Sequence, residues 1–556
     1  MVRQLGLHEV AQPSGFRAIE PVAADLFDSH LLKETSAMTR HARIAFALFS
    51  TLVVIHPIAV ATAESRPNIL FIFSDDHALQ AIGAYQGWLA GVDPTPNIDR
   101  LAAQGMLFEQ SFCTNSICGP SRAVILTGKH SHLNGFRQNG DRFDPAQWTF
   151  PKELRAAGYQ TAMLGKWHLG SDPQGFDYWR ALPGQGDYYN PRFRTPEGVV
   201  TIEGHCTEIV TDLAEAWLRD QRDQSKPFLL MCQHKAPHRT WMPAPEHLGL
   251  WADEDLPVPE TLFDTWEDNA SPAREQQMTV AKDLDLYYDL FVDGIEVGEG
   301  RESRDASGRK NQERMTEQQL RDWGEAFDAE NRAFVEDPPT GKALVHWKLQ
   351  RYLKNYLRCI RGVDDSVGRM LELLDELELA DNTIVVYSSD QGFYLGDHGW
   401  YDKRWMYDES MRMPLIIRWP EVAEPGSRCQ QLVQNLDYAA TFLEAAGVEA
   451  SEPMQGHSLV PLLKGETPGQ WRDALYYRYF EGPPAIHRVA AHYGIRTRDH
   501  KLIYFYEDDL WELYDLQNDP DELANIYGKS DYDEITSDLK LRLDELRELY
   551  RDDSGG

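Results

Sequence analysis

The segment around Cys118 holds the residues best suited to chemistry. It reads Cys-Gly-Pro-Ser-Arg-Ala-Val-Ile-Leu-Thr-Gly over residues 118–128. Pro120 suits the first turn of a helix and Gly128 its end, which places Cys118 at a helix N-terminus, where free N–H groups favour negative charge. Arg122 then falls one turn along the same face. The pattern predicts an activated thiol at Cys118; a disulfide to Cys113 is the alternative.

Three aspartates follow apolar runs of the chain. Asp75 and Asp76 come directly after residues 68–73, and Asp390 comes shortly after residues 383–387. Taken singly, each also fits a turn or a helix cap. Brought together they would repel one another, and a hard divalent cation with oxygen ligands relieves that repulsion. The aspartates therefore predict a calcium or magnesium site, to which Gln391 can add a carbonyl oxygen.

The elements that must position these groups alternate between strands and helices. Four short apolar runs end in polar clusters and are typical of buried strands: residues 68–73, 161–164, 228–232 and 383–387. Helical periodicity appears at 207–221 and 345–378. This alternation predicts an α/β fold with a large mixed, mostly parallel sheet sandwiched by helices. Open sheets of this kind bind ligands beyond the carboxyl ends of their strands, where all four clusters lie.

The motif C-x-P-S-R-x-x-x-x-T-G resembles the signature of the type I, formylglycine-dependent sulfatases, which belong to the alkaline-phosphatase-like superfamily. Further matches follow in family order, at residues 165–170 (GKWHLG), 236–238 (APH), 389–392 (SDQG), 511–516 (WELYDL) and 519–520 (DP). The resemblance covers about residues 66–530. It implies an alkaline-phosphatase-like fold and the hydrolysis of sulfate esters.

The resemblance also implies a cofactor and a modification. Cys118 would be oxidised to formylglycine (3-oxoalanine) by a formylglycine-generating maturation enzyme. The implied metal ligands are Asp75, Asp76, residue 118, Asp390 and Gln391. The family most often has Asn or His in place of Gln391. Calcium is the expected ion, because its looser geometry tolerates the longer side chain better than that of magnesium.

Basic residues complete the implied catalytic set. By resemblance Lys166, His168, His238 and Lys403 bind sulfate and transfer protons, and Arg122 completes the catalytic set with Cys118 by holding its hydrated aldehyde. Cations gathered around one point suit the charge that develops on a reacting sulfate. Alone, each histidine also fits a structural role. We expect His234 to be structural or part of a rim, since the family places the catalytic histidine after Ala-Pro.

The expected substrate is a sulfated carbohydrate. Residues 234–243 and 389–400 look like those of bacterial glycan sulfatases, including N-acetylglucosamine-6-sulfatase relatives. Arg404 and His487 are candidate sugar contacts. Aromatic residues suit sugar stacking, although most in so large a number belong to cores: Tyr188, Tyr189, Trp241, Trp400 and Trp405. Two other functions stay open, a phosphatase or phosphonate hydrolase and a non-catalytic glycan-binding protein.

The chain divides into three expected parts. Residues 1–63 are an N-terminal preface and signal peptide, 64–465 the sulfatase-like catalytic α/β domain, and 466–556 a smaller antiparallel sheet with a helix near 531–551. Residues 252–342 interrupt the alternation of strands and helices and are expected to be an insertion. This insertion either forms a rim around the substrate or makes no contact with it.

The N-terminal segment predicts export. The apolar run at 44–60 has a basic flank at 40–43 and is followed by Ala61-Thr62-Ala63, as in a secretory signal peptide. A single membrane anchor is the alternative, weakened by His56 and Pro57. We expect cleavage after Ala63, no stable membrane insertion afterwards, and a periplasmic or secreted protein.

Overall charge restricts the partners. The 556 residues include 55 Lys and Arg against 88 Asp and Glu, a net charge of −33. Such acidity disfavours nucleic acid and anionic membranes, so an anionic substrate requires a local cationic pocket. The six cysteines include no C-x-x-C pair, which makes a thiolate zinc site unsupported.

Overall fold

The computed structural model describes residues 66–295, 310–482 and 488–553. All of them belong to one compact unit, Thr62–Gly556. The predicted signal peptide and His487 lie outside the described residues. Within those residues, every helix is too short or too polar to cross a membrane.

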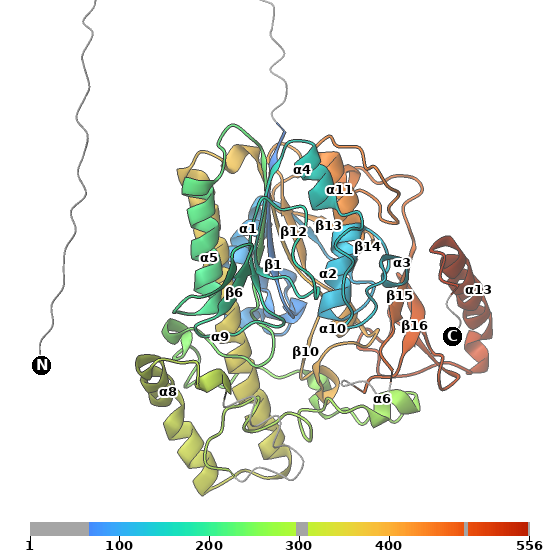
Figure 1. Cartoon of the computed structure of the whole chain (residues 1–556). Helices are drawn as coiled ribbons and strands as arrows, with labels where there is room; N and C mark the ends of the chain where they lie inside the picture. The colour runs from blue at the N-terminus through green and yellow to red at the C-terminus, as the bar shows by residue number, and fades with distance from the viewer. Residues whose placement is uncertain (1–65, 296–309, 483–487, 554–556) are drawn as a thin grey trace, which may run out of the picture. The chain divides into compact units, whose positions relative to one another are not determined.

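A ten-stranded mixed sheet forms the centre of the molecule (Figure 1). Its order is β13-β2-β12-β9-β1-β8-β4-β5-β6-β7. The strands from β9 to β5 run parallel to one another, whereas β12 is antiparallel to both β9 and β2. The bounds are β1 Asn68–Ser74, β2 Met106–Phe108, β4 Gln160–Lys166, β5 Tyr178–Leu182, β6 Arg192–Thr195, β7 Gly198–Thr201, β8 Phe228–Gln233, β9 Thr383–Ser389, β12 Leu415–Arg418 and β13 Ser427–Cys429. The predicted fold class is confirmed.

The four apolar runs of the sequence are the four neighbouring central strands β9, β1, β8 and β4. Every residue of β1 is buried, with Ile69 paired to Leu229 on one side and Ile384 on the other. Strands covered on both faces need continuous apolar sequence. Because parallel neighbours end at the same edge, their polar ends meet there.

Helices cover both faces of the sheet (Figure 1). On one face α1 (Pro96–Gln104), α5 (Cys206–Ala216) and α9 (Gly341–Glu376) pack together. On the other, α2 (Cys118–Thr127) and α4 (Phe150–Ala156) pack with α11 (Asp437–Ala445). Residues at helical spacing on α9 are fully buried, as its sequence period predicts.

The C-terminal part is a four-stranded antiparallel sheet carrying one helix. Its strands are β15 (Ala474–Tyr479), β16 (His492–Thr497), β17 (His500–Phe505) and β18 (Leu510–Asp515), and α13 (Asp533–Leu549) packs on them. Leu539 and Leu543 of α13 join a separate apolar cluster with Ile495 and Leu513.

The insertion packs against the main domain. Its described elements are η6 (Glu260–Phe263), α6 (Ser271–Glu275) and α8 (Glu317–Glu336). A capping box between Thr316 and Gln319 begins α8, and Trp323 and Phe327 of α8 are buried in the main core. Thr279 also forms a β-bridge with Trp400, next to a short hairpin of β10 (Tyr394–Leu395) and β11 (Tyr401–Asp402).

Candidate active site

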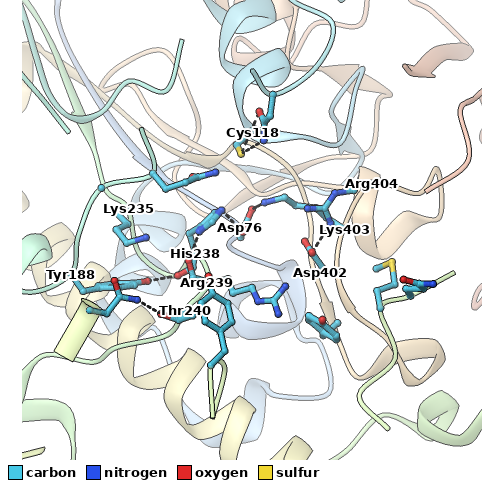
Figure 2. Close-up of a pocket in the computed structure, with 18 residues that line it drawn as sticks. Asp76, Cys118, Tyr188, Lys235, His238, Arg239, Thr240, Asp402, Lys403 and Arg404 are labelled. Atoms are coloured by element: carbon cyan, nitrogen blue, oxygen red, sulfur yellow. Dashed lines mark hydrogen bonds and ion pairs between the residues drawn. The ribbon is translucent and has the colours of Figure 1, made fainter. Parts of the chain in front are cut away.

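A polar cavity of about 560 Å³ opens beyond the carboxyl ends of the central strands (Figure 2). Asp76, Cys118, His238 and Lys403 line it, although hundreds of residues separate the first from the last. The strand order explains this meeting, because β1, β8 and β9 are adjacent and Lys403 follows the hairpin after β9.

Three buried carboxylates converge at the floor of the site. One oxygen each of Asp75, Asp76 and Asp390 lies within 4.8 Å of the others, and the Asp76 N–H donates to Asp390 Oδ1 at 3.0 Å. Asp76 has a φ of 70°, a left-handed turn conformation that aspartate tolerates. The sequence allowed either a turn residue or a metal-binding carboxylate at Asp76, and in the structure this residue is in a turn and also belongs to the carboxylate cluster.

The donor set fits a hard divalent cation. Asp75 Oδ1, Asp76 Oδ2 and Gln391 Oε1 are buried oxygens without a hydrogen-bond partner. Buried oxygens left unpaired are costly, and a cation would satisfy all three. Oxygen-only ligands favour calcium or magnesium over softer metals.

The protonation of the carboxylates supports the same interpretation. Burial raises the pKa of Asp390 well above its usual value and that of Asp76 to about 7. Burial also opposes ionisation of Asp75, but the neighbouring Lys166 holds the pKa of that carboxyl well below its usual range. An added divalent cation is what would allow all three to be charged at neutral pH.

Three cations from three elements complete the cluster. Lys166, at the end of β4, forms an ion pair with Asp75, and Lys403 forms one with Asp76. Gly165 allows β4 to approach β8, since a Cβ there would lie 1.9 Å from the carbonyl oxygen of Gln233. Arg122 Nη2 lies 3.1 Å from Asp390 Oδ2, so α2 is tied to the end of β9.

Cys118 begins α2 and is completely buried. Burial raises its pKa, but Lys403 and Lys166 outweigh that and lower the pKa of the thiol well below its usual value. Asn139 Nδ2 donates to Cys118 Sγ at 3.4 Å. All six cysteines are free, which rules out the alternative disulfide to Cys113 in this structure. Position 118 is therefore a place where negative charge is stabilised.

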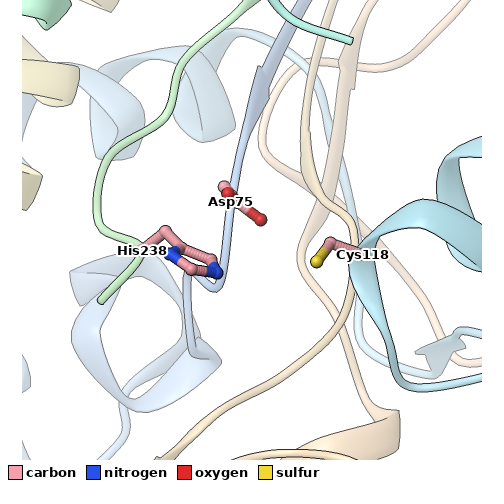
Figure 3. A group of neighbouring side chains, drawn as sticks. All are labelled: Asp75, Cys118 and His238. Carbon is pink, nitrogen blue, oxygen red and sulfur yellow. The ribbon is translucent and has the colours of Figure 1, made fainter. Parts of the chain in front are cut away.

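His238 faces both the carboxylates and Cys118 (Figure 3). One ligand atom each of Asp75, Cys118 and His238 lies within 4.8 Å of the others. His238 Nδ1 donates to the carbonyl oxygen of Arg239 at 2.5 Å, and Nε2 lies 3.8 Å from Asp76 Oδ2. Burial, followed by the charge of Lys166, lowers the pKa of His238 to about 3, so the ring is neutral near pH 7 and its Nε2 is unprotonated.

The other two histidines differ in role. His168 is half-buried, with a φ of 56°, and a hydrogen bond from it helps to lower the pKa of Cys118. His234 is fully buried, with Nε2 3.0 Å from Ser366 Oγ, and is absent from the cavity lining. It is a structural residue, one of the two roles expected for it.

Comparison with known proteins agrees with this geometry. The sulfatase family model matches residues 67–448. The chain belongs to the sulfatase family. A second model, N-sulphoglucosamine sulphohydrolase, C-terminal, matches residues 396–549 of this sulfatase.

Similar proteins bear the names of sulfatases. An N-acetylglucosamine-6-O-sulfatase of Bacteroides thetaiotaomicron is 47% identical over 494 residues, 88% of this chain and 87% of its own. An ulvan-active sulfatase of Formosa agariphila is 25% identical over 529 residues, 91% and 86% of the two chains. A solved structure in complex with its substrate D-glucosamine-2-N,6-O-disulfate superposes with a TM-score of 0.83 at 45% identity, covering 88% of this chain and 99% of that one. The protein is thus a sulfatase hydrolase.

The structure adds lining residues that the sequence did not single out. Asn139, Lys235 and Arg239 line the cavity, as do residues of the insertion: Gln277, Met278, Tyr288 and Asn311. Of the two roles left open for the insertion, the rim of the cavity is the one seen. Lys235 lies inside the His-Lys-Ala-Pro-His segment, which was the available signal; for Asn139 there was none.

The expected sugar contacts have mixed outcomes. Arg404 lines the cavity, with Nη1 2.5 Å from Asp402 Oδ2. The prediction that sugar stacks on Trp241, Trp400 or Trp405 is wrong. At most 1% of each side chain is exposed, and all three belong to the core. Tyr189 is buried and absent from the lining, while Tyr188 does line the cavity.

Proposed function

We propose that this sulfatase hydrolyses sulfate esters on sulfated carbohydrates through a formylglycine formed from Cys118 beside a bound calcium ion. The observation that carries the proposal is the meeting of unpaired buried oxygens and basic side chains around position 118. The oxygens suit a divalent cation, and the basic groups suit a sulfate.

The cation would be held by Asp75, Asp76, Asp390, Gln391 and an oxygen of the modified residue 118. When bound, it supplies positive charge that offsets the carboxylates and polarises the sulfate oxygens. Calcium is proposed over magnesium because the long Gln391 side chain suits a flexible ligand shell.

A hydrated aldehyde at residue 118 carries two hydroxyls on one carbon, one to attack sulfur and one to expel sulfate afterwards. Asp390 accepts the proton of the attacking hydroxyl, which Arg122 orients. Lys166, Lys403 and His238 stabilise the sulfate oxygens. The negative charge of the bound sulfate would raise the pKa of His238, and His238 or Lys403 then protonates the leaving alcohol. His168 then takes the proton of the second hydroxyl. A serine or an unmodified cysteine lacks that second hydroxyl.

Substrate and location extend the proposal. The names of the similar proteins support a glucosamine residue bearing a 6-O-sulfate. Arg404, which lines the cavity, is the proposed sugar contact. The apolar run at 44–60 supports export to the periplasm or the exterior after signal cleavage. A formylglycine-generating enzyme of the host would convert Cys118.

The test compares sulfate release with the state of residue 118. Protein from a converting host should release sulfate from N-acetylglucosamine 6-sulfate, and the peptide containing residue 118 should have the mass of formylglycine. Calcium chelation should stop the reaction and calcium should restore it. Full activity with a thiol at 118, or faster hydrolysis of the matching phosphate ester, would contradict the proposal.

A further inference from the structure

Four Lys and Arg side chains line the cavity, and three of them have a carboxylate partner. Lys403 pairs with Asp76, and Arg404 with Asp402. Arg239 pairs with Asp289 through two hydrogen bonds of 2.5 and 2.7 Å. Within residues 66–295, 310–482 and 488–553, Lys235 has no ion pair with a carboxylate. Asp75 and Asp187 act on its charge only at longer range, so Lys235 is the lining cation without a paired carboxylate among the described residues.

Lys235 is fixed in place rather than free to swing into solvent. Only 4% of it is exposed, and Nζ lies 4.6 Å from the centre of the Tyr188 ring. The Tyr188 hydroxyl donates to the carbonyl oxygen of His238 at 2.7 Å, and the His238 N–H donates to that of Lys235 at 3.0 Å. The turn after β8 therefore holds Lys235 and His238 as one unit.

Lys235 lies apart from the side chains proposed to bind the reacting sulfate. Lys166, Lys403 and His238 surround the carboxylates beside Cys118. Figure 2 shows Lys235 and Tyr188 on one side of His238, with Lys403 and Arg404 on the other. A substrate whose reacting sulfate lies at Cys118 would thus present another of its substituents to Lys235.

A buried ammonium without a counter-ion is unfavourable, and an aromatic face offsets only part of that cost. Burial, followed by the positive charge of Lys166, lowers the pKa of Lys235 to about 8. A ligand anion would remove this penalty at the moment of binding. The same side chain would bind a neutral substituent with no such gain.

We propose that Lys235 binds a second anionic substituent of the substrate, one that is not hydrolysed. This rests on the proposed sulfatase function and narrows its substrate class to sugars with two acidic groups. The second anion is a sulfamate on the same sugar or a carboxylate on a neighbouring one. The substrate bound in the similar solved structure is a glucosamine disulfate, which carries a sulfamate on the same sugar as the 6-O-sulfate.

Three substrates separate these sources: N-acetylglucosamine 6-sulfate, glucosamine 2-N,6-O-disulfate, and N-acetylglucosamine 6-sulfate linked to a hexuronate. The measurement is kcat/KM for each, relative to the first. We expect the wild type to prefer the second or the third, and Lys235→Met to reduce that preference roughly ten- to a hundredfold, as for a lost charge-assisted hydrogen bond. Lys235→Gln should do the same, and Lys235→Arg should retain part of the preference.

Lys226→Met is the matched control, since Lys226 is 54% exposed and absent from the lining; it should leave the preference unchanged. A preference that survives in both Lys235→Met and Lys235→Gln overturns the inference, as does a wild type with no preference. Both results leave the sulfatase proposal intact. If wild-type protein with converted residue 118 releases sulfate from none of the three, the proposed function fails and the inference falls with it.

Discussion

Calcium should stabilise the fold through the buried carboxylates, and the size of the effect can be estimated. At a calcium concentration 100 times the Kd, binding adds about 2.7 kcal/mol to the free energy of unfolding. Unfolding entropy of about 2.1 cal/mol/K per residue, taken over Thr62–Gly556, is about 1 kcal/mol/K, so the melting temperature should rise by about 3 °C. Differential scanning calorimetry with and without a chelator measures this shift.

The shift should also grow with pH. Burial raises the pKa of Asp76 to about 7, whereas an unfolded aspartate has a value near 3.9. Between these values the folded, cation-free protein holds more protons than the unfolded chain, so its stability falls as pH rises. Calcium displaces those protons. The calcium-dependent rise in melting temperature should therefore be small near pH 4 and largest above pH 7.

Two variants decide whether the carboxylates are responsible. Asp390→Asn should abolish most of the calcium shift, because it removes one of the three charges. Asp381→Asn changes an exposed aspartate of η7 (Ala380–Asn382) and should keep the full shift. The reasoning is refuted if the wild type shows no shift, or if Asp390→Asn retains that of the wild type.

Three further outcomes are expected. Cys118→Ala should keep the calcium shift but lose sulfate release by roughly 10⁴-fold or more; parent-level turnover in a rate assay would exclude a covalent role. His238→Ala should lower kcat by roughly 10²- to 10⁴-fold, whereas His234→Ala should cost about 1–3 kcal/mol of stability and leave kcat of the folded protein unchanged, and equal kcat losses would contradict this division. Asp408→Asn should lower the free energy of unfolding by about 3–5 kcal/mol, because the buried cations Arg496 at 2.8 Å and Lys501 at 2.7 Å lose their half-buried partner; urea denaturation measures it, and a loss under about 1 kcal/mol would show that Glu522 alone suffices.

Much of the fold was predictable because its signals are local. The apolar run at 68–73 needs no distant information to be recognised as a buried strand, and Pro120 and Gly128 delimit α2 by backbone preference alone. The outer strands β6 and β7 were missed, since short strands that are largely open to water lack an apolar run. The four predicted strands are neighbours in the sheet. In the sequence, the only sign of this adjacency is that each strand ends in a polar cluster.

The site divides in a similar way. Residues in recognisable motifs, such as Lys166 and His238, could be predicted to converge. Asn139 and Gln277 could not, because they reach the cavity through loops whose paths depend on packing between distant segments. The prediction for Trp241 and Trp400 was wrong for a physical reason: the same aromatic side chain suits a sugar platform and a core, and burial alone separates them.

The complete burial of Cys118 restricts when the protein can be processed. Cys118 lines the cavity but is 0% exposed, and every residue of helix α2 is buried. The proposed maturation enzyme would need access to the segment around residue 118, and the buried helix α2 of the folded chain does not offer it. Under the proposed function, oxidation of Cys118 would therefore precede folding, and a chain that folds first would keep its thiol. The yield of active protein in a foreign host would then depend on the rate of oxidation relative to the rate of folding. Growth at low temperature slows folding and should favour the active form.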